Sequence, residues 1–159
     1  MKIFKFAQKI VTHRYLSLAF RLYIAGIFIY AAMYKISYAG EFAETIASYR
    51  IIPYWSVNIT AVVMPWLELI CGLLLISGIR AKAAVSVIIG LLAVFTIAIV
   101  VNLIRDTPIG CGCFKSLDEK MDWTTLVRDL IWLSMAIHIY FFDTLFHLEK
   151  KSIMRIKDV

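Results

Sequence analysis

The chain has 159 residues, of which 62% are hydrophobic and 14% aromatic, and it carries a net charge of +6. A soluble domain has nearer to about half apolar residues, so this composition and a mean hydropathy of +0.81 indicate a membrane protein. The basic residues flank apolar segments and form no continuous patch, which argues against a nucleic-acid-binding protein.

Four apolar segments, covering residues 16–34, 57–76, 83–104 and 124–142, are each 19–22 residues long. A helix needs roughly 20 residues to cross the core of a bilayer. The short segments of alternating polarity that are typical of membrane strands do not occur. The sequence therefore predicts an all-α membrane protein, with residues 1–159 forming a single domain that is a bundle of four transmembrane helices.

Residues 38–52, between the first two spans, have apolar side chains every three or four positions with acidic residues between them. This pattern predicts a short amphipathic helix lying along the outer membrane interface. Pro53 is expected to end that helix, and Tyr54 and Trp55 are expected to anchor the start of the second span among the lipid headgroups.

The basic residues predict the orientation of the bundle. Residues 1–21 carry five basic residues and no acidic one, and the second connection carries Arg80 and Lys82, whereas residues 105–129 have a net charge of −1. Basic residues in short loops stay on the cytoplasmic side. Both termini are therefore predicted to be cytoplasmic, and the third connection, with its two cysteines, to be extracytoplasmic, where disulfides persist.

Cys111 and Cys113 are separated by Gly112 in this third connection. Their sulfurs can bond if the two Cα atoms lie within about 7 Å, and the glycine removes a Cβ that would resist the necessary bend. A ring this small is expected to be strained and easily exchanged. Arg105 and Lys115 lie close in sequence, and a nearby cation favours the thiolate that carries out exchange.

Other interpretations of the cysteine pair are a structural disulfide, two inert thiols, or half of a metal site. Three cysteines and three scattered histidines supply no second half, so no metal is expected. Cys71 lies in the second span, about 20 Å along the helix from the outer loop. It is predicted to be a buried small hydrophobe outside the site.

Glu68 lies in the middle of the second span, three residues after Pro65, which is expected to kink the helix. An acid inside the membrane is costly unless it is paired, protonated or hydrated. One interpretation is a proton relay or a polar contact for a quinone or a lipid headgroup. The other is an ion pair between helices, with Arg21, Lys35 or Arg105 as partner.

Several polar residues near the helix ends are predicted to reach the membrane interface, where they need no further role. They are Arg21, Lys35, Asn102, Arg105, Arg128 and Asp129. Arg105 is the one considered further, because it is nearest to the thiols in sequence.

The chain resembles the MauE/DoxX family of redox-associated membrane proteins. The resemblance rests on RLYIAGIFIYAAMYKI, FAETIASYRIIP, MPWLELICGLLLISGIRAKAA, NLIRDTPIGCGCF and WTTLVRD. It implies a four-helix bundle with Cys111 and Cys113 as the redox pair and Glu68 and Arg105 as polar residues of the bundle. Lys115 stands where the family commonly has glycine.

The methylamine-utilisation branch of that family is linked to a thioredoxin-like periplasmic partner and to disulfide formation in a secreted dehydrogenase subunit. The DoxX branch is linked to a quinone-reducing thiosulfate oxidoreductase. The resulting hypothesis is a thiol–disulfide relay in the inner membrane of a bacterium, an oxidoreductase that exchanges electrons with a thioredoxin-like secreted partner and passes them to or from quinone. The alternatives are a non-catalytic scaffold or assembly factor whose disulfide is structural, and a small-molecule transporter that uses Glu68.

Overall fold

The computed structural model describes residues 14–105 and 123–142, and every described element is a helix. The helices are α2 (Arg14–Ser37), α3 (Ala39–Tyr49), α4 (Tyr54–Ser77), α5 (Ala81–Ile104) and α6 (Trp123–Phe142). By length and composition α2, α4, α5 and α6 can each cross a membrane. The four predicted spans are thereby confirmed. Each helix extends beyond its predicted span by at most three residues at either end.

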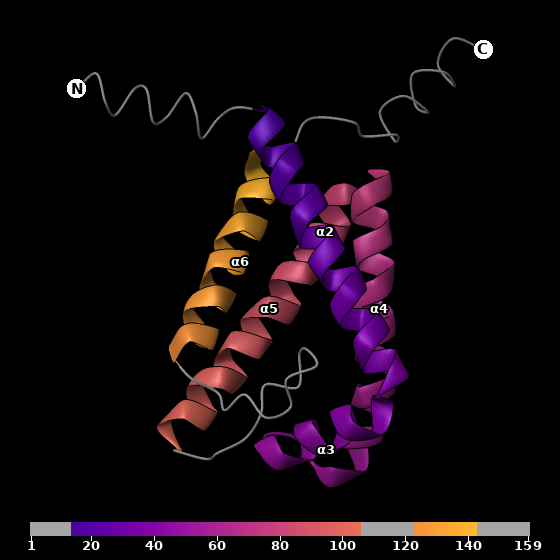
Figure 1. The fold of residues 1–159 in the computed structure, drawn as a ribbon, viewed down its shortest axis with the longest axis vertical. Coiled ribbons are helices and arrows are strands. Elements are labelled where there is room, and N and C mark those ends of the chain that lie inside the picture. The colour runs from indigo at the N-terminus through magenta and orange to yellow at the C-terminus, as the bar shows by residue number, and fades with distance from the viewer. Residues whose placement is uncertain (1–13, 106–122, 143–159) are drawn as a thin grey trace.

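Figure 1 shows α2, α4, α5 and α6 running along one another, with α3 lying at one end of the bundle. The ends of α2 and α5 and the starts of α4 and α6 lie at this end, which we call the α3 end. The start of α2 and the end of α6 lie at the opposite end. The connection 106–122 therefore joins two helices at the α3 end.

Helix α3 is amphipathic, as predicted, although it is shorter than the predicted residues 38–52. Phe42 and Ile46 on its buried face pack against Val57 and Ala61 near the start of α4. The helix ends where Arg50 adopts a left-handed conformation with a φ of 51°. Burial of this apolar face fixes α3 against the first turns of α4.

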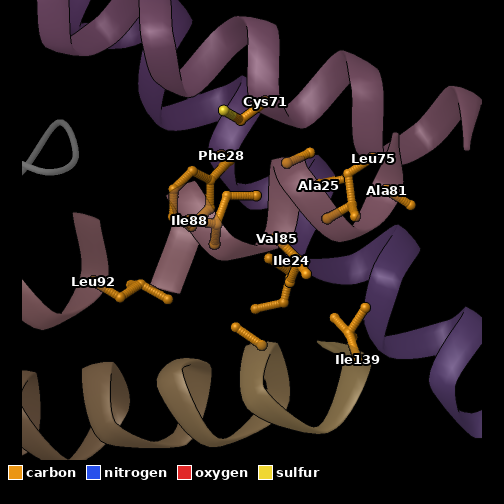
Figure 2. Packing of buried hydrophobic residues seen from close by; sticks show 12 residues of the cluster. Ile24, Ala25, Phe28, Cys71, Leu75, Ala81, Val85, Ile88, Leu92 and Ile139 are labelled. Atoms are coloured by element: carbon orange, nitrogen blue, oxygen red, sulfur yellow. The ribbon is translucent and has the colours of Figure 1, made fainter. Parts of the chain in front are cut away.

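The main core lies between α2, α4, α5 and α6, and Figure 2 shows it from close by. Its side chains include Ile24 and Phe28 of α2, Leu75 of α4 and Ile88 of α5. Cys71 belongs to the same cluster and is only 5% exposed, which confirms its predicted role as a buried small hydrophobe.

Helices α2 and α4 approach each other closely at Gly72. A Cβ added to this glycine would lie 2.8 Å from Ile29 Cγ1 and 3.2 Å from the carbonyl oxygen of Ala25. The absence of a side chain at position 72 is therefore what allows the two helices to pack at this distance.

Arg21 was predicted to reach the interface, but it is 1% exposed and the prediction is wrong. Its Nε donates a hydrogen bond of 2.6 Å to the carbonyl oxygen of Leu75, and its Nη2 donates one of 3.3 Å to that of Ile76. These carbonyls belong to the last turn of α4, where the helix offers acceptors without donors and a partial negative charge. Arg21 therefore caps α4 from the neighbouring helix.

Arg21→Lys should lower the free energy of unfolding by about 1–2 kcal/mol, because a lysine keeps the charge but cannot reproduce the fork that binds two carbonyls. Reversible unfolding in mixed detergent–lipid micelles would measure the loss. Arg50→Lys is the matched control, since Arg50 is exposed and should change stability by no more than about 0.5 kcal/mol. Equal effects of the two substitutions would contradict the capping role.

Candidate functional site

Cys111, Gly112 and Cys113 lie outside the described residues, which stop at Arg105 and resume at Trp123. The structure describes the two helix ends that the cysteine-bearing connection joins. Both belong to the α3 end of the bundle (Figure 1).

Arg105 forms the C-cap of α5, and its backbone N–H donates to the carbonyl oxygen of Val101 at 3.1 Å. Its Nη1 donates a 3.2 Å hydrogen bond to the carbonyl oxygen of Tyr49, the last residue of α3. Tyr49 is itself buried. Arg105, the last described residue before the connection, is therefore held to α3 by a hydrogen bond. It lies six positions before Cys111 in the sequence.

Glu68 forms an ion pair with Lys35 across the α2–α4 interface. The lysine Nζ lies 2.7 Å from Glu68 Oε1 and 2.9 Å from Oε2, and the two residues are 4% and 5% exposed. Of the two interpretations of Glu68, the structure shows the ion pair between helices, with Lys35 as the partner. Arg21 and Arg105, the other two candidates, donate to backbone carbonyls instead.

The helix lengths explain how Lys35, two residues before the end of α2, reaches Glu68, the fifteenth residue of α4. At about 1.5 Å per residue, Glu68 lies roughly 21 Å along α4 from Tyr54. The first turns of α4 pack on α3, beyond the last turn of α2. The end of α2 therefore stands beside the middle of α4, and Lys35, predicted to reach the interface, is buried.

Two aromatic rings complete the surroundings of the lysine. Its Nζ lies 5.1 Å from the ring centroid of Phe42 in α3 and 5.7 Å from that of Phe95 in α5. A cation above the face of a ring is attracted by the ring's electron density, and the attraction grows when water is excluded. Four helices thus contribute to one buried polar centre.

A second polar contact joins α5 to α6. Thr96 Oγ1 forms a hydrogen bond with Asp129 Oδ2, and it also lies 2.8 Å from the carbonyl oxygen of Leu92. Asp129 is 3% exposed, so its predicted place at the interface is also wrong. Asn102 is likewise buried, and its Nδ2 donates to the carbonyl oxygen of Ala98 at 2.9 Å.

A cavity of about 40 Å³ lies between the ion pair and Asp129. Its wall consists of Ile27, Phe28, Ala31, Lys35, Met64, Glu68, Leu91, Leu92, Phe95, Asp129 and Trp132. This volume admits a few water molecules, each of which needs at least about 10–15 Å³. It is far below the roughly 300–1,000 Å³ of organic ligand pockets, so the cavity does not fit a quinone ring.

A larger groove, of about 540 Å³, lies between α2 and α6. Tyr23 lines it from α2, and Trp123, Thr124, Val127, Arg128, Ile131 and Trp132 line it from α6. The guanidinium carbon of Arg128 lies 5.0 Å from the ring centroid of Trp132. This volume is within the roughly 300–1,000 Å³ of organic ligand pockets, and the walls carry aromatic and cationic side chains.

The chain is similar to a family of known proteins. The sequence model of the methylamine utilisation protein MauE matches residues 13–142, which include all the described helices. The chain belongs to the MauE family. The family resemblance predicted from the sequence is thereby confirmed.

Several relatives carry the name methylamine utilization protein MauE, and three of them are compared with this chain. That of Paracoccus denitrificans is 31% identical over 124 residues, or 76% of this chain and 66% of the relative. That of Methylorubrum extorquens is 33% identical over 101 residues, or 62% and 54%. That of Paracoccus versutus is 31% identical over 132 residues, or 82% and 71%. The matched part thus spans just under two thirds of the first relative and about half of the second. No solved structure matches the chain.

Sequence reasoning found Glu68 and named its partner among three candidates, but it did not connect Asp129 or Thr96 with the same centre. The sequence does hold a feature that points to these two residues, namely polar side chains inside apolar spans. Asp129 lies six residues inside α6, and Thr96 stands in an otherwise apolar stretch of α5. A second acid inside a span calls for a buried partner in the same way as the first.

Proposed function

We propose that this chain is a membrane thiol–disulfide relay of methylamine utilisation, in which Cys111 and Cys113 exchange a disulfide with a secreted thioredoxin-like partner. The observation that carries the proposal is the place of the cysteine connection. It joins α5 to α6 at the α3 end, and it begins at Arg105, which is held to Tyr49. Membership of the MauE family supports the same conclusion, because the named relatives act in methylamine utilisation.

The distribution of charge supports an extracytoplasmic α3 end. Arg80, between α4 and α5, and Lys82, in the first turn of α5, lie at the opposite end, and basic residues at short loops remain cytoplasmic. With this orientation both termini are cytoplasmic and the cysteines face the compartment in which disulfides form. The proposed membrane is the inner membrane of a bacterium.

A thiolate of the reduced partner attacks one sulfur of the Cys111–Cys113 disulfide, that bond breaks, and a mixed disulfide forms. The second partner thiolate then attacks the mixed disulfide, which leaves the partner oxidised and Cys111 and Cys113 as thiols. Two electrons and two protons have moved from the partner to this chain. Arg105 lies six residues before Cys111, and a cation near a sulfur would favour its thiolate form in these steps.

Renewal of the disulfide requires an acceptor of two electrons and two protons, and a quinone, which becomes a quinol, is the acceptor we propose. The α2–α6 groove, of about 540 Å³, has room for its ring. Trp132 and Tyr23 would flank such a ring, and Arg128 would donate to one of its oxygens.

The relay is tested by trapping the mixed disulfide. When the oxidised partner is added, so that the exchange runs in reverse, Cys111→Ser and Cys113→Ser, made separately, should leave one variant covalently joined to the partner on a non-reducing gel, because the second cysteine of this chain, which would release the partner, is missing. The double serine variant should show no such adduct. The secreted substrate, which is the protein whose cysteines the partner oxidises, should then form no disulfides. Cys71→Ser is the matched control, since this thiol is buried in the core and should leave both readouts unchanged.

Normal substrate oxidation by the double serine variant would contradict the relay and favour the scaffold. The orientation is checked separately with a membrane-impermeant maleimide on intact cells. A single cysteine at position 113 should react at once, whereas Lys82→Cys in a background without other cysteines should react only after permeabilisation. The reverse pattern would contradict the proposed orientation.

A further inference from the structure

The small cavity brings together three ionisable side chains from three helices: Lys35 of α2, Glu68 of α4 and Asp129 of α6. All three are at least nine-tenths buried. If both acids were ionised, the cavity wall would carry two negative charges and one positive charge. An uncompensated charge is strongly unfavourable inside a membrane bundle, so one further positive charge in the cavity wall, such as a proton on one of the two acids, would balance the centre.

The hydrogen bonds of Thr96 point to a proton on Asp129 as that positive charge. Its Oγ1 lies within hydrogen-bonding distance of two oxygens, the carbonyl of Leu92 and Oδ2 of Asp129. A threonine hydroxyl has one hydrogen, and a carbonyl oxygen can only accept. When Thr96 donates to Leu92, in the usual contact of a helical threonine with the residue four positions earlier, the hydrogen between Thr96 and Asp129 must come from the carboxyl group.

We propose that Asp129 carries a proton and that the central cavity is a site at which this proton is taken up and released, with Lys35 and Glu68 as its fixed counter-pair. The cavity has room for a few waters, which can connect the carboxyl of Asp129 with the ion pair. The neighbouring Arg128 has its guanidinium above the ring of Trp132, and no other ionisable side chain lines the cavity wall among the described residues. The proposal goes beyond thiol exchange and does not depend on it.

Charge balance gives a distinct expectation for each variant. The wild-type protein should hold one protonated carboxyl in this centre, and Asp129→Asn should hold none. Glu68→Gln should also hold none, because Asp129 then ionises to balance Lys35. Lys35→Met should hold two, because both acids are then left without a cation.

Infrared spectroscopy of the full chain in lipid nanodiscs at neutral pH measures these numbers directly. The carbonyl stretch of a protonated carboxyl is separate from that of a carboxylate, and it shifts when water is exchanged for D₂O. The expected band areas for wild type, Asp129→Asn, Glu68→Gln and Lys35→Met are in the ratio 1:0:0:2. Glu41→Gln is the matched control, since Glu41 is exposed on α3 and should leave the band unchanged.

A wild-type protein without the band, or an Asp129→Asn variant that retains it, would overturn the proposal. If Asp129→Asn does not fold, Thr96→Val supplies the test, because loss of the hydroxyl should shift the frequency of the band. An unshifted band in that variant would also overturn it. A band that appears only after sodium is removed would show that a metal cation, and no proton, balances the site.

Discussion

Replacing Lys35 by methionine should lower the free energy of unfolding by about 3–5 kcal/mol, the usual cost of removing one member of a buried ion pair. The substitution leaves Glu68 in the bundle without its cation, and Phe42 and Phe95 lose the charge that lies near their rings. Reversible unfolding in bicelles, followed by circular dichroism, would measure the loss. Lys82→Met is the matched control, because Lys82 is exposed and should change stability by about 0.5 kcal/mol or less.

The double variant Lys35→Met/Glu68→Met should regain most of that stability. Well-packed apolar side chains often replace a buried pair without loss, since neither charge then has to leave water. A double variant as unstable as Lys35→Met alone would show that packing around the methylene chain of the lysine, and not the pairing of charges, is what the single substitution destroys.

Gly72→Ala should lower the free energy of unfolding by about 1–3 kcal/mol, as is typical when a methyl group is forced into a packed interface. Its Cβ would lie 3.2 Å from a backbone oxygen of α2 that cannot turn away, and 2.8 Å from a side-chain carbon. Helices α2 and α4 would have to separate, which would also weaken the contact between Lys35 and Glu68. The same unfolding assay measures this effect.

Gly90→Ala provides the comparison, since a Cβ at that helical position would meet no atom within 4 Å. It should be neutral or stabilising by up to about 1 kcal/mol, because alanine favours a helix more than glycine does. Losses of similar size at positions 72 and 90 would show that close packing is not the reason for the glycine at position 72.

The long helices and α3 could be predicted from the sequence because each depends on a local pattern. An apolar run of membrane-spanning length predicts a helix whatever its neighbours are, and the three- and four-residue spacing around Phe42 and Ile46 predicts the buried face of α3. Cys71 could be placed in the core for the same reason, because its whole surroundings in the sequence are apolar.

The interior polar centre could not be predicted in full, because it depends on how far one helix extends past another. Lys35 lies two residues from the end of α2, a position that suggests the interface when α2 is considered alone. Only the packing of α3 against the first turns of α4 reveals that this end stands at the depth of Glu68. Asp129 was misplaced for a similar reason, since its burial depends on Thr96 in a different helix.

The pairing of Lys35 with Glu68 has a consequence for biogenesis. Ribosomes deliver α2 and α4 to the bilayer before α5 and α6 exist, and either segment alone would carry an isolated charge into hydrocarbon. Since the two charges meet across the α2–α4 contact, this nascent helical hairpin can bury Lys35 and Glu68 as a neutral pair, with no help from later segments. Asp129 arrives last, on α6, and finds its hydroxyl partner on the helix inserted just before it.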